Sequence, residues 1–282
     1  AGAFESPLLR LTEKLERYGT DDSTRSDILA TSILGIAAGG RLSKHRVPRP
    51  APLSAPDLVE ARALAATPRE FLEQLTWTDA IAPRLRGTHA SKDSAEALMN
   101  RKLVLSEEQT LDITVPISWP DDASGRTSAA DIFGLEFLSG PLNYWYSKAN
   151  GRESTKVAEV DAVLKKHGAT ASQILAQSGA IIMDFVGKHP LSASTAWEEN
   201  AVSRRARVFA LYLLCCKMAV KRKIKFDEAV CTEVILRLLE AVEVLRSDDF
   251  YTPCSFDGVQ QDCLLVGLAL VLRTTAYSQV LM

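Results

Sequence analysis

The chain has 282 residues and 46% of them are hydrophobic, which is enough for one large core or two small ones and argues against a disordered chain. Its formal net charge is −2 at pH 7. A general nucleic-acid or membrane-surface binder normally carries a basic excess, so neither class is expected, although a local basic cleft is still allowed. The apolar run ILATSILGIAAGG is too short to span a bilayer, so no membrane span is predicted.

Neither a metal nor a cofactor is predicted. The four histidines lack the spacing of a metal site, and no glycine-rich phosphate loop follows a predicted strand. All five cysteines fall in the last third of the chain, and Cys215 and Cys216 lie in an apolar helical run. Buried free thiols are therefore favoured over disulfides or metal ligands. With no signal peptide in view, this indicates a cytoplasmic protein, or a periplasmic one if the N-terminus is truncated.

Apolar residues at helical spacing recur along most of the chain. In chain order, helices are predicted over 6–19, 23–40, 54–75, 93–100, 128–151, 156–168, 170–190, 195–223, 225–247 and 258–277. Pro68 is expected to split the third of these helices, and Asp227 is expected to cap the ninth. Glycines are expected to end several of them.

The segment 77–130 is less regular than the rest. Within it, LDITVPISW at 111–119 is either one short strand or an extended loop, and its proline argues against a central strand. Helices joined by short turns tend to stack as antiparallel pairs. We therefore predict an all-α fold, an incomplete α/α toroid of stacked helical hairpins without a substantial sheet. It forms a single domain over 1–282, which could be a fragment of a longer multidomain protein.

Three segments carry a resemblance to a known family. Twelve residues in these segments match the motifs of that family in order and spacing: Trp119, Leu135, Leu138, Leu142, Trp197, Ser203, Arg205, Phe250, Tyr251, Gly258, Gln261 and Asp262. Through these positions the stretch 115–275 resembles the heparinase II/III-like and alginate-lyase superfamily. The last segment, DDFYTPCSFDGVQQDC, is similar to the corner that leads into an apolar helix in that family.

The resemblance implies an α/α toroid that acts on uronic-acid polysaccharides by β-elimination. That reaction needs the sugar carboxylate neutralised, a base for the C5 proton and an acid for the leaving oxygen. The asparagine–histidine pair of the family falls on Phe256 and Asp257 here. A phenylalanine donates no hydrogen bond, and an aspartate adds charge of the wrong sign beside an anionic substrate. We therefore expect binding rather than cleavage; if the chain is active, it is a polysaccharide lyase.

Candidate site residues follow from the resemblance and from the chemistry of sugars. Asp257 and Tyr251 are the candidate catalytic residues, with a helix cap and a packed aromatic as their alternative roles. The candidate substrate-binding residues offer aromatic faces, amides, a hydroxyl and a guanidinium: Trp119, Asn143, Trp145, Tyr146, Trp197, Asn200, Arg205 and Ser255. Arg205 could hold a carboxylate in a bidentate grip. Core packing or a helix–helix seam explains the aromatic residues equally well.

The basic run KMAVKRKIK at 217–225 is interpreted as a solvated helix end, with contact to a polyanion as the alternative.

Two hypotheses for function stay open. The leading one is a lyase-like α domain that binds an acidic, uronate-containing bacterial polysaccharide or oligosaccharide in capsule or exopolysaccharide metabolism, without a nucleic-acid partner. The alternative is a helical scaffold for a protein partner, without a sugar site, which predicts a broad concave surface with exposed apolar residues.

Overall fold

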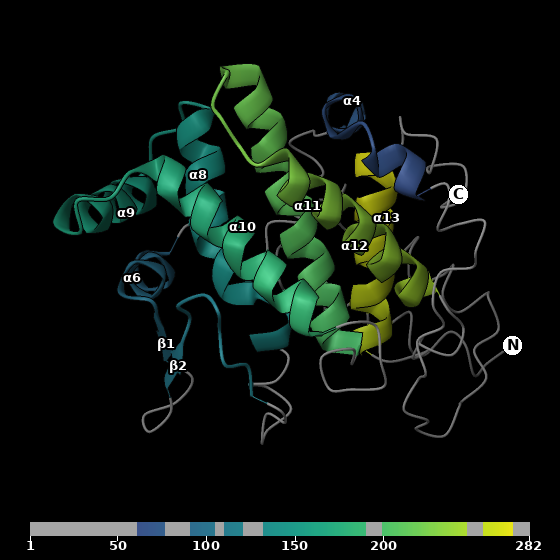
Figure 1. Cartoon of the computed structure of the whole chain (residues 1–282), viewed down its shortest axis with the longest axis horizontal. Helices are drawn as coiled ribbons and strands as arrows, with labels where there is room; N and C mark the ends of the chain where they lie inside the picture. The colour runs from purple at the N-terminus through teal and green to yellow at the C-terminus, as the bar shows by residue number, and fades with distance from the viewer. Residues whose placement is uncertain are drawn as a thin grey trace, which may run out of the picture.

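Figure 1 shows the computed structural model, in which helices predominate. It describes residues 61–76, 91–104, 110–120, 132–189, 199–246 and 256–272, without the side chains of 199, 200, 256–260 and 262. The elements are α4 (Pro68–Gln74), α6 (Lys92–Asn100), β1 (Lys102–Val104), β2 (Thr110–Asp112), η1 (Glu136–Leu138), α8 (Ser139–Ala149), α9 (Thr155–Lys166), α10 (Ala171–Lys188), α11 (Glu199–Arg222), α12 (Glu228–Arg246) and α13 (Phe256–Leu272). In these ranges the only sheet is the antiparallel pair β1–β2, with Leu103 opposite Leu111. The prediction of an α-helical chain without a substantial sheet is confirmed for this part of the protein.

Several helix ends lie where local sequence rules place them. Pro68 occupies the first turn of α4 and separates it from a helical segment at 61–65. α9 ends just before Gly168, which has a left-handed φ of 59°. The side chain of Asp227 accepts hydrogen bonds from the backbone amides of Ala229 and Val230 at 2.9 and 3.3 Å. The predicted cap of this helix is thus confirmed.

Two predicted boundaries differ from the structure. The helix expected from 128 is interrupted, because Leu135 has a left-handed φ of 55° and a 3₁₀ turn precedes α8. α13 begins at Phe256 rather than at Gly258, so the expected corner at 255–258 is already helical from Phe256 onward. The stretch 111–119 was predicted as either a short strand or an extended loop, and it contains both. Residues 111 and 112 belong to β2, and the rest is neither helix nor strand. The predicted helices at 6–19 and 23–40 lie outside the described residues.

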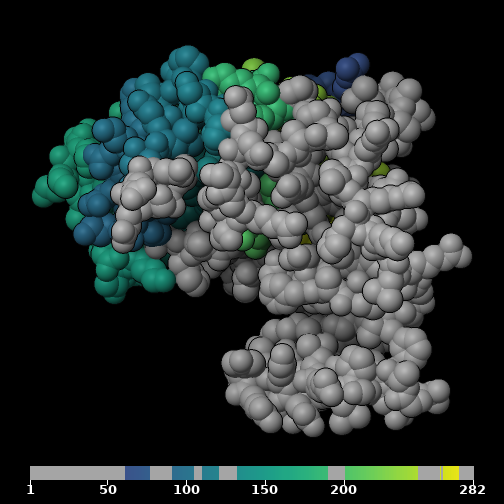
Figure 2. All heavy atoms as spheres, turned by 90° about the horizontal axis from the view of Figure 1, so that it is seen from below, coloured from purple at the N-terminus to yellow at the C-terminus, as the bar shows by residue number. Residues whose placement is uncertain are grey.

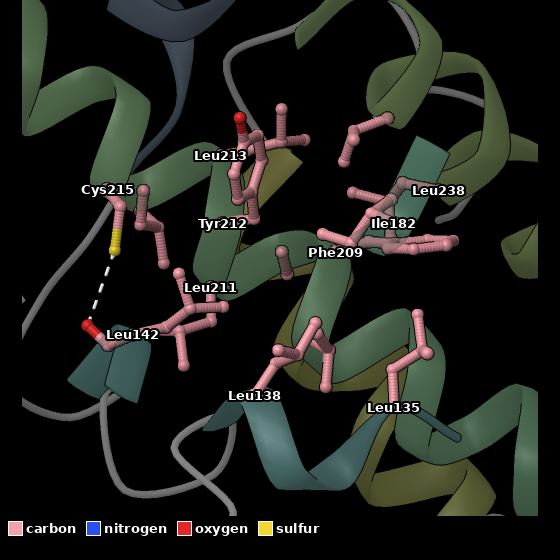
Figure 3. Packing of buried hydrophobic residues seen from close by; sticks show 14 of the residues in the cluster. Leu135, Leu138, Leu142, Ile182, Phe209, Leu211, Tyr212, Leu213, Cys215 and Leu238 are labelled. Atoms are coloured by element: carbon pink, nitrogen blue, oxygen red, sulfur yellow. Dashed lines mark hydrogen bonds between the residues drawn. The ribbon is translucent and has the colours of Figure 1, made fainter. Parts of the chain in front are cut away.

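α11 forms the centre of the packing. It contacts α4, α8, α10, α12, α13 and η1, and every residue from 208 to 216 is buried. Figure 3 shows leucine and isoleucine side chains of the neighbouring elements packed against α11, which contributes Phe209, Leu211, Tyr212 and Leu213. Each fully buried side chain of this size contributes about 1.5–3 kcal/mol to folding. Cys215 and Cys216 are free and fully buried, which confirms their prediction as small core residues.

The remaining elements extend to both sides of α11. In Figure 1 α9, α6 and the β1–β2 pair lie on one side, and α12, α13 and α4 lie on the other. Asp161 holds α9 against α8 by accepting hydrogen bonds from Tyr144 Oη at 2.6 Å and from Lys148 Nζ at 2.7 Å. In the space-filling view from below, the teal side chains of the middle of the chain form one continuous surface (Figure 2).

Of the described glycines, Gly179 has the least space for a side chain. It lies where α10 packs against α11 and α12. A Cβ placed on it would lie 2.6 Å from Tyr212 Oη and 3.2 Å from Val230 Cγ1. Tyr212 is itself buried, so its ring has little room to move. Gly187, two turns later in α10, has no atom within 4 Å of the same position. The two glycines therefore differ in packing but not in secondary structure.

We expect Gly179→Ala to lower the free energy of unfolding by about 1–3 kcal/mol, because the added methyl overpacks the three-helix contact. The matched control, Gly187→Ala, should be neutral or stabilise by up to about 1 kcal/mol through helix propensity. Urea unfolding followed by circular dichroism measures both. Adding Tyr212→Phe to the first variant should recover part of the loss, since it removes the clashing oxygen. Equal stability of the two alanine variants would contradict this account of the packing.

Candidate functional site

Five predicted substrate-binding residues have described side chains, and all are largely buried. Their exposed fractions are 9% for Trp119, 4% for Asn143, 2% for Trp145, 7% for Tyr146 and 2% for Arg205. These side chains therefore pack mainly against other parts of the protein. Their roles toward a ligand stay predictions.

The other candidates are not described in enough detail to place them. Trp197, Tyr251 and Ser255 lie outside the described residues, as do the side chains of Asn200 and Asp257.

Trp119 and Arg205 meet in one aromatic cluster, which also includes Phe133, Phe185 and His189. The Trp119 and Phe185 rings lie edge to face with centroids 5.3 Å apart, and Phe185 lies 4.7 Å from the His189 ring. The guanidinium of Arg205 lies over the Phe185 ring, 5.0 Å from its centroid, and Nη1 donates to the Phe133 carbonyl at 2.7 Å. Cation–π contact and a charge-assisted hydrogen bond thus stabilise this cation inside the core.

Burial lowers the pKa of Arg205 to about 9, opposed in part by the carboxylate of Glu240. A guanidinium this deep in the protein cannot reach a ligand on the surface without a rearrangement. Asp184 fixes the position of Trp119 at the edge of the cluster through hydrogen bonds. Its Oδ2 accepts hydrogen bonds from Trp119 Nε1 at 2.8 Å and from the backbone amide of Ile117 at 3.2 Å.

Folding opposes the protonation of His189 as well as that of Arg205. Burial lowers its pKa most, the positive charges of Arg205 and Lys188 lower it further, and Asp184 partly offsets them. Its Nε2 is buried without a hydrogen-bond partner in the structure, so a proton there would gain no acceptor. The folded protein therefore favours neutral His189.

Stability should fall as the pH drops below about 6.5, the ordinary pKa of histidine, because the unfolded chain then binds a proton that the folded chain resists. His189→Phe keeps a ring in the cluster but cannot titrate, so it should lose less stability than the wild type between pH 7.5 and pH 5.5. Urea unfolding at both pH values measures this difference. His167→Gln, a substitution at an exposed histidine outside the cluster, is the matched control. An unchanged pH dependence in His189→Phe would contradict the assignment.

A groove between α4, α8 and α11 has the composition expected of a sugar site. We call it the α4–α11 groove; it is lined by Gln74, Tyr146, Asn150, Lys217, Met218 and Lys221, among others. Its volume of about 560 Å³ lies within the range of about 300–1,000 Å³ that is usual for small-molecule sites. An aromatic residue, two amides and two ammonium groups line one concave surface. Of the five predicted substrate-binding residues with described side chains, Tyr146 is the one that lines it.

Among the described residues that line the α4–α11 groove, the side chains charged at neutral pH are those of Lys217, Lys221 and Glu73. Two positive charges and one negative charge leave a net charge of +1. Lys217 and Lys221 are four residues apart on α11, so their side chains lie on the same face of the helix. The groove therefore attracts an anion, although the whole chain is nearly neutral.

Lys217 also fixes one wall of the groove. Its Nζ donates to the backbone carbonyls of Glu73, at 2.9 Å, and Leu75. These carbonyls belong to the C-terminal end of α4, where the helix dipole is negative. Partial burial lowers the pKa of Lys217, with a further contribution from Lys221. Lys217 thus ties α4 to α11.

We expect Lys217→Met to destabilise the protein by about 1–2 kcal/mol, because two carbonyls lose a charged donor. The loss should be local, so backbone amides of α4 should exchange with deuterium faster than those of α12. Hydrogen exchange measured by mass spectrometry reports both. Lys221→Met is the matched control on the same helix face and should leave the exchange of α4 unchanged. Equal protection of α4 in both variants would show that Lys217 does not hold it.

A second hollow lies along α10 and has a different chemistry. Its volume is about 510 Å³, and its walls are mainly apolar, with Leu175, Met183 and Phe226 beside the carboxylates of Asp184 and Asp227. Carboxylates disfavour an acidic ligand. Of these two sites, the α4–α11 groove is therefore the better one for an anion.

The residues that line the α4–α11 groove were mostly missed by sequence reasoning. Gln74 and Asn150 carry no signal of their own, because a polar residue near a helix end is usually solvated. Lys217 and Lys221 belong to the basic run at 217–225, for which contact with a polyanion was the alternative interpretation. The signal was present there, but the sequence did not indicate that α4 would supply an opposite wall.

Three further observations bear on the protein as a whole. No helix among the described residues combines the length and apolarity needed to cross a membrane. Within the same residues, no cluster of three His, Cys, Asp or Glu side chains could hold a metal ion. No protein-family model matches the chain, and the comparisons with curated proteins and with solved structures gave no match.

Proposed function

We propose that this chain is a lyase-like α-helical domain that binds an acidic, uronate-containing oligosaccharide or polysaccharide in the α4–α11 groove without cleaving it. The observation that carries the proposal is the composition of this groove, in which Tyr146, Asn150, Lys217 and Lys221 line one surface. Sugar binding uses an aromatic face for the ring, amides for the hydroxyls and a cation for the carboxylate. Each kind of group lines this groove of suitable size, although only 7% of Tyr146 is exposed.

The proposal includes the finer features that the resemblance implies. The helices would follow the toroid arrangement of the heparinase II/III-like family, and the ligand would be a bacterial capsule or exopolysaccharide. The absence of cleavage follows from Phe256 and Asp257 at the positions where that family has asparagine and histidine. A phenylalanine donates no hydrogen bond and an aspartate repels a carboxylate, so these two positions supply neither the neutralisation nor the histidine that the family uses in cleavage.

The scaffold alternative depends on an exposed apolar surface. In the described part of the chain the large exposed hydrophobic residues are Val104, Val115 and Val266. They belong to three separate segments: β1, the chain after β2, and α13. Single exposed valines are normal on a soluble protein surface, so this distribution supports the groove over a broad docking face.

We expect uronate oligosaccharides prepared from alginate and polygalacturonate to bind in isothermal titration calorimetry, while a neutral cellulose oligosaccharide of equal length binds more weakly. Binding should weaken as salt rises, because a partly exposed ion pair is screened. Absorbance of the unsaturated product should not increase during incubation. Absence of binding by every uronate oligosaccharide would refute the proposed function, and product formation would refute the claim that cleavage is lost.

A further inference from the structure

The two lysines of the α4–α11 groove are not equivalent. An ammonium group has three donors. Lys217 uses two of them on the carbonyls of Glu73 and Leu75, so its position is fixed by the protein itself. Lys221 lies one turn later, is exposed, and makes no hydrogen bond or ion pair within the described residues. Only Lys221 therefore has all its donors available to a ligand.

The surroundings of Lys221 favour one anionic group beside it. Lys217 lies on the same helix face, and the two positive charges repel each other across one turn. Among the described residues that line the groove, Glu73 has the one carboxylate side chain, and these residues together have a net charge of +1. One carboxylate bound at Lys221 would bring this charge to zero and would relieve the repulsion. A second anion in the same groove would find no further free ammonium among the lining residues that the structure describes.

The neutral lining groups define where the rest of the ligand lies. The Asn150 side chain donates to the Tyr146 carbonyl through Nδ2 at 2.9 Å, which turns its amide toward the end of α8. Tyr146, Asn150 and Gln74 line the groove together with Lys217 and Lys221. A ligand carboxylate at Lys221 thus places the adjoining sugar ring among groups that recognise hydroxyls and an apolar ring face.

We propose that Lys221 is the residue that binds the ligand's carboxylate, and that the groove takes one uronate carboxylate at a time, whereas Lys217 is a positioning residue that fixes the α4 wall. This inference rests on the proposed function, because it assigns the ionic contact within the same groove. It predicts that the contribution of the ligand's carboxylate to binding depends on Lys221.

A thermodynamic cycle between protein and ligand tests the assignment. Wild type and Lys221→Gln are each titrated with a polygalacturonate oligosaccharide and with the same oligosaccharide after reduction of its carboxyl groups to alcohols. For the wild type, reduction should weaken binding about tenfold, as expected for loss of a charge-assisted hydrogen bond. For Lys221→Gln, the acidic and the reduced ligand should bind equally. Lys221→Arg should restore the preference for the acidic ligand.

Lys225→Gln provides the matched control, because Lys225 is an exposed lysine at the same helix end but lines the α10 hollow instead. It should keep the full wild-type preference. If the wild type binds the acidic ligand and Lys221→Gln keeps the same preference, the assignment of Lys221 is overturned while the proposed function stands. If no uronate oligosaccharide binds the wild type, the proposed function and this inference both fall.

Discussion

α11 is surrounded by other helices along its apolar middle, and the arrangement of the described chain depends on that burial. From 208 to 216 no side chain is exposed, so each face of the helix must contact a different neighbour. A helix that is apolar on all sides is stable in water only when other elements cover it completely. α8, α10, α12, α13 and α4 meet this requirement. The contact of Gly179 with Tyr212 shows how closely one of them approaches, since even a methyl group has no space there.

The same constraint accounts for the position of the α4–α11 groove. Lys217 follows directly after the last residue of the buried run, at the point where α11 leaves the core. A lysine at such a boundary can bury its aliphatic stem and direct its ammonium outward. Here the ammonium meets the negative end of α4, which makes a wall for the groove, and the next lysine on the same face stays exposed. The groove thus forms because the buried run of α11 is followed by a lysine that bonds to α4.

Much of the fold could be predicted from residue patterns, because the determinants are local. Pro68, Gly168 and Asp227 end or begin helices through their own backbone preferences and side chains, and the all-α character follows from apolar spacing. The break at Leu135 could not be predicted, since a leucine is rarely left-handed and only tertiary packing holds it there. The site was predicted less well. Arg205 has a charge that suggests a ligand, but its partners are Phe185 on the preceding helix and Phe133, which lies 72 positions earlier in the chain. Lys221 acquires its surroundings from α4, more than a hundred residues earlier.

The attachment of α4 also affects how this chain can fold during synthesis. Arg69 pairs with Glu228, 159 positions later, and Lys217 bonds to Glu73 across 144 positions. Thr76 donates to the Val271 carbonyl at 2.8 Å, which joins the same segment to α13. A ribosome completes α4 long before any of these partners exist. The segment around α4 must therefore wait, undocked, until α11, α12 and α13 have been synthesised, and contacts of such high sequence separation slow folding. The α4–α11 groove consequently forms only after α11 has been made, more than a hundred residues after α4.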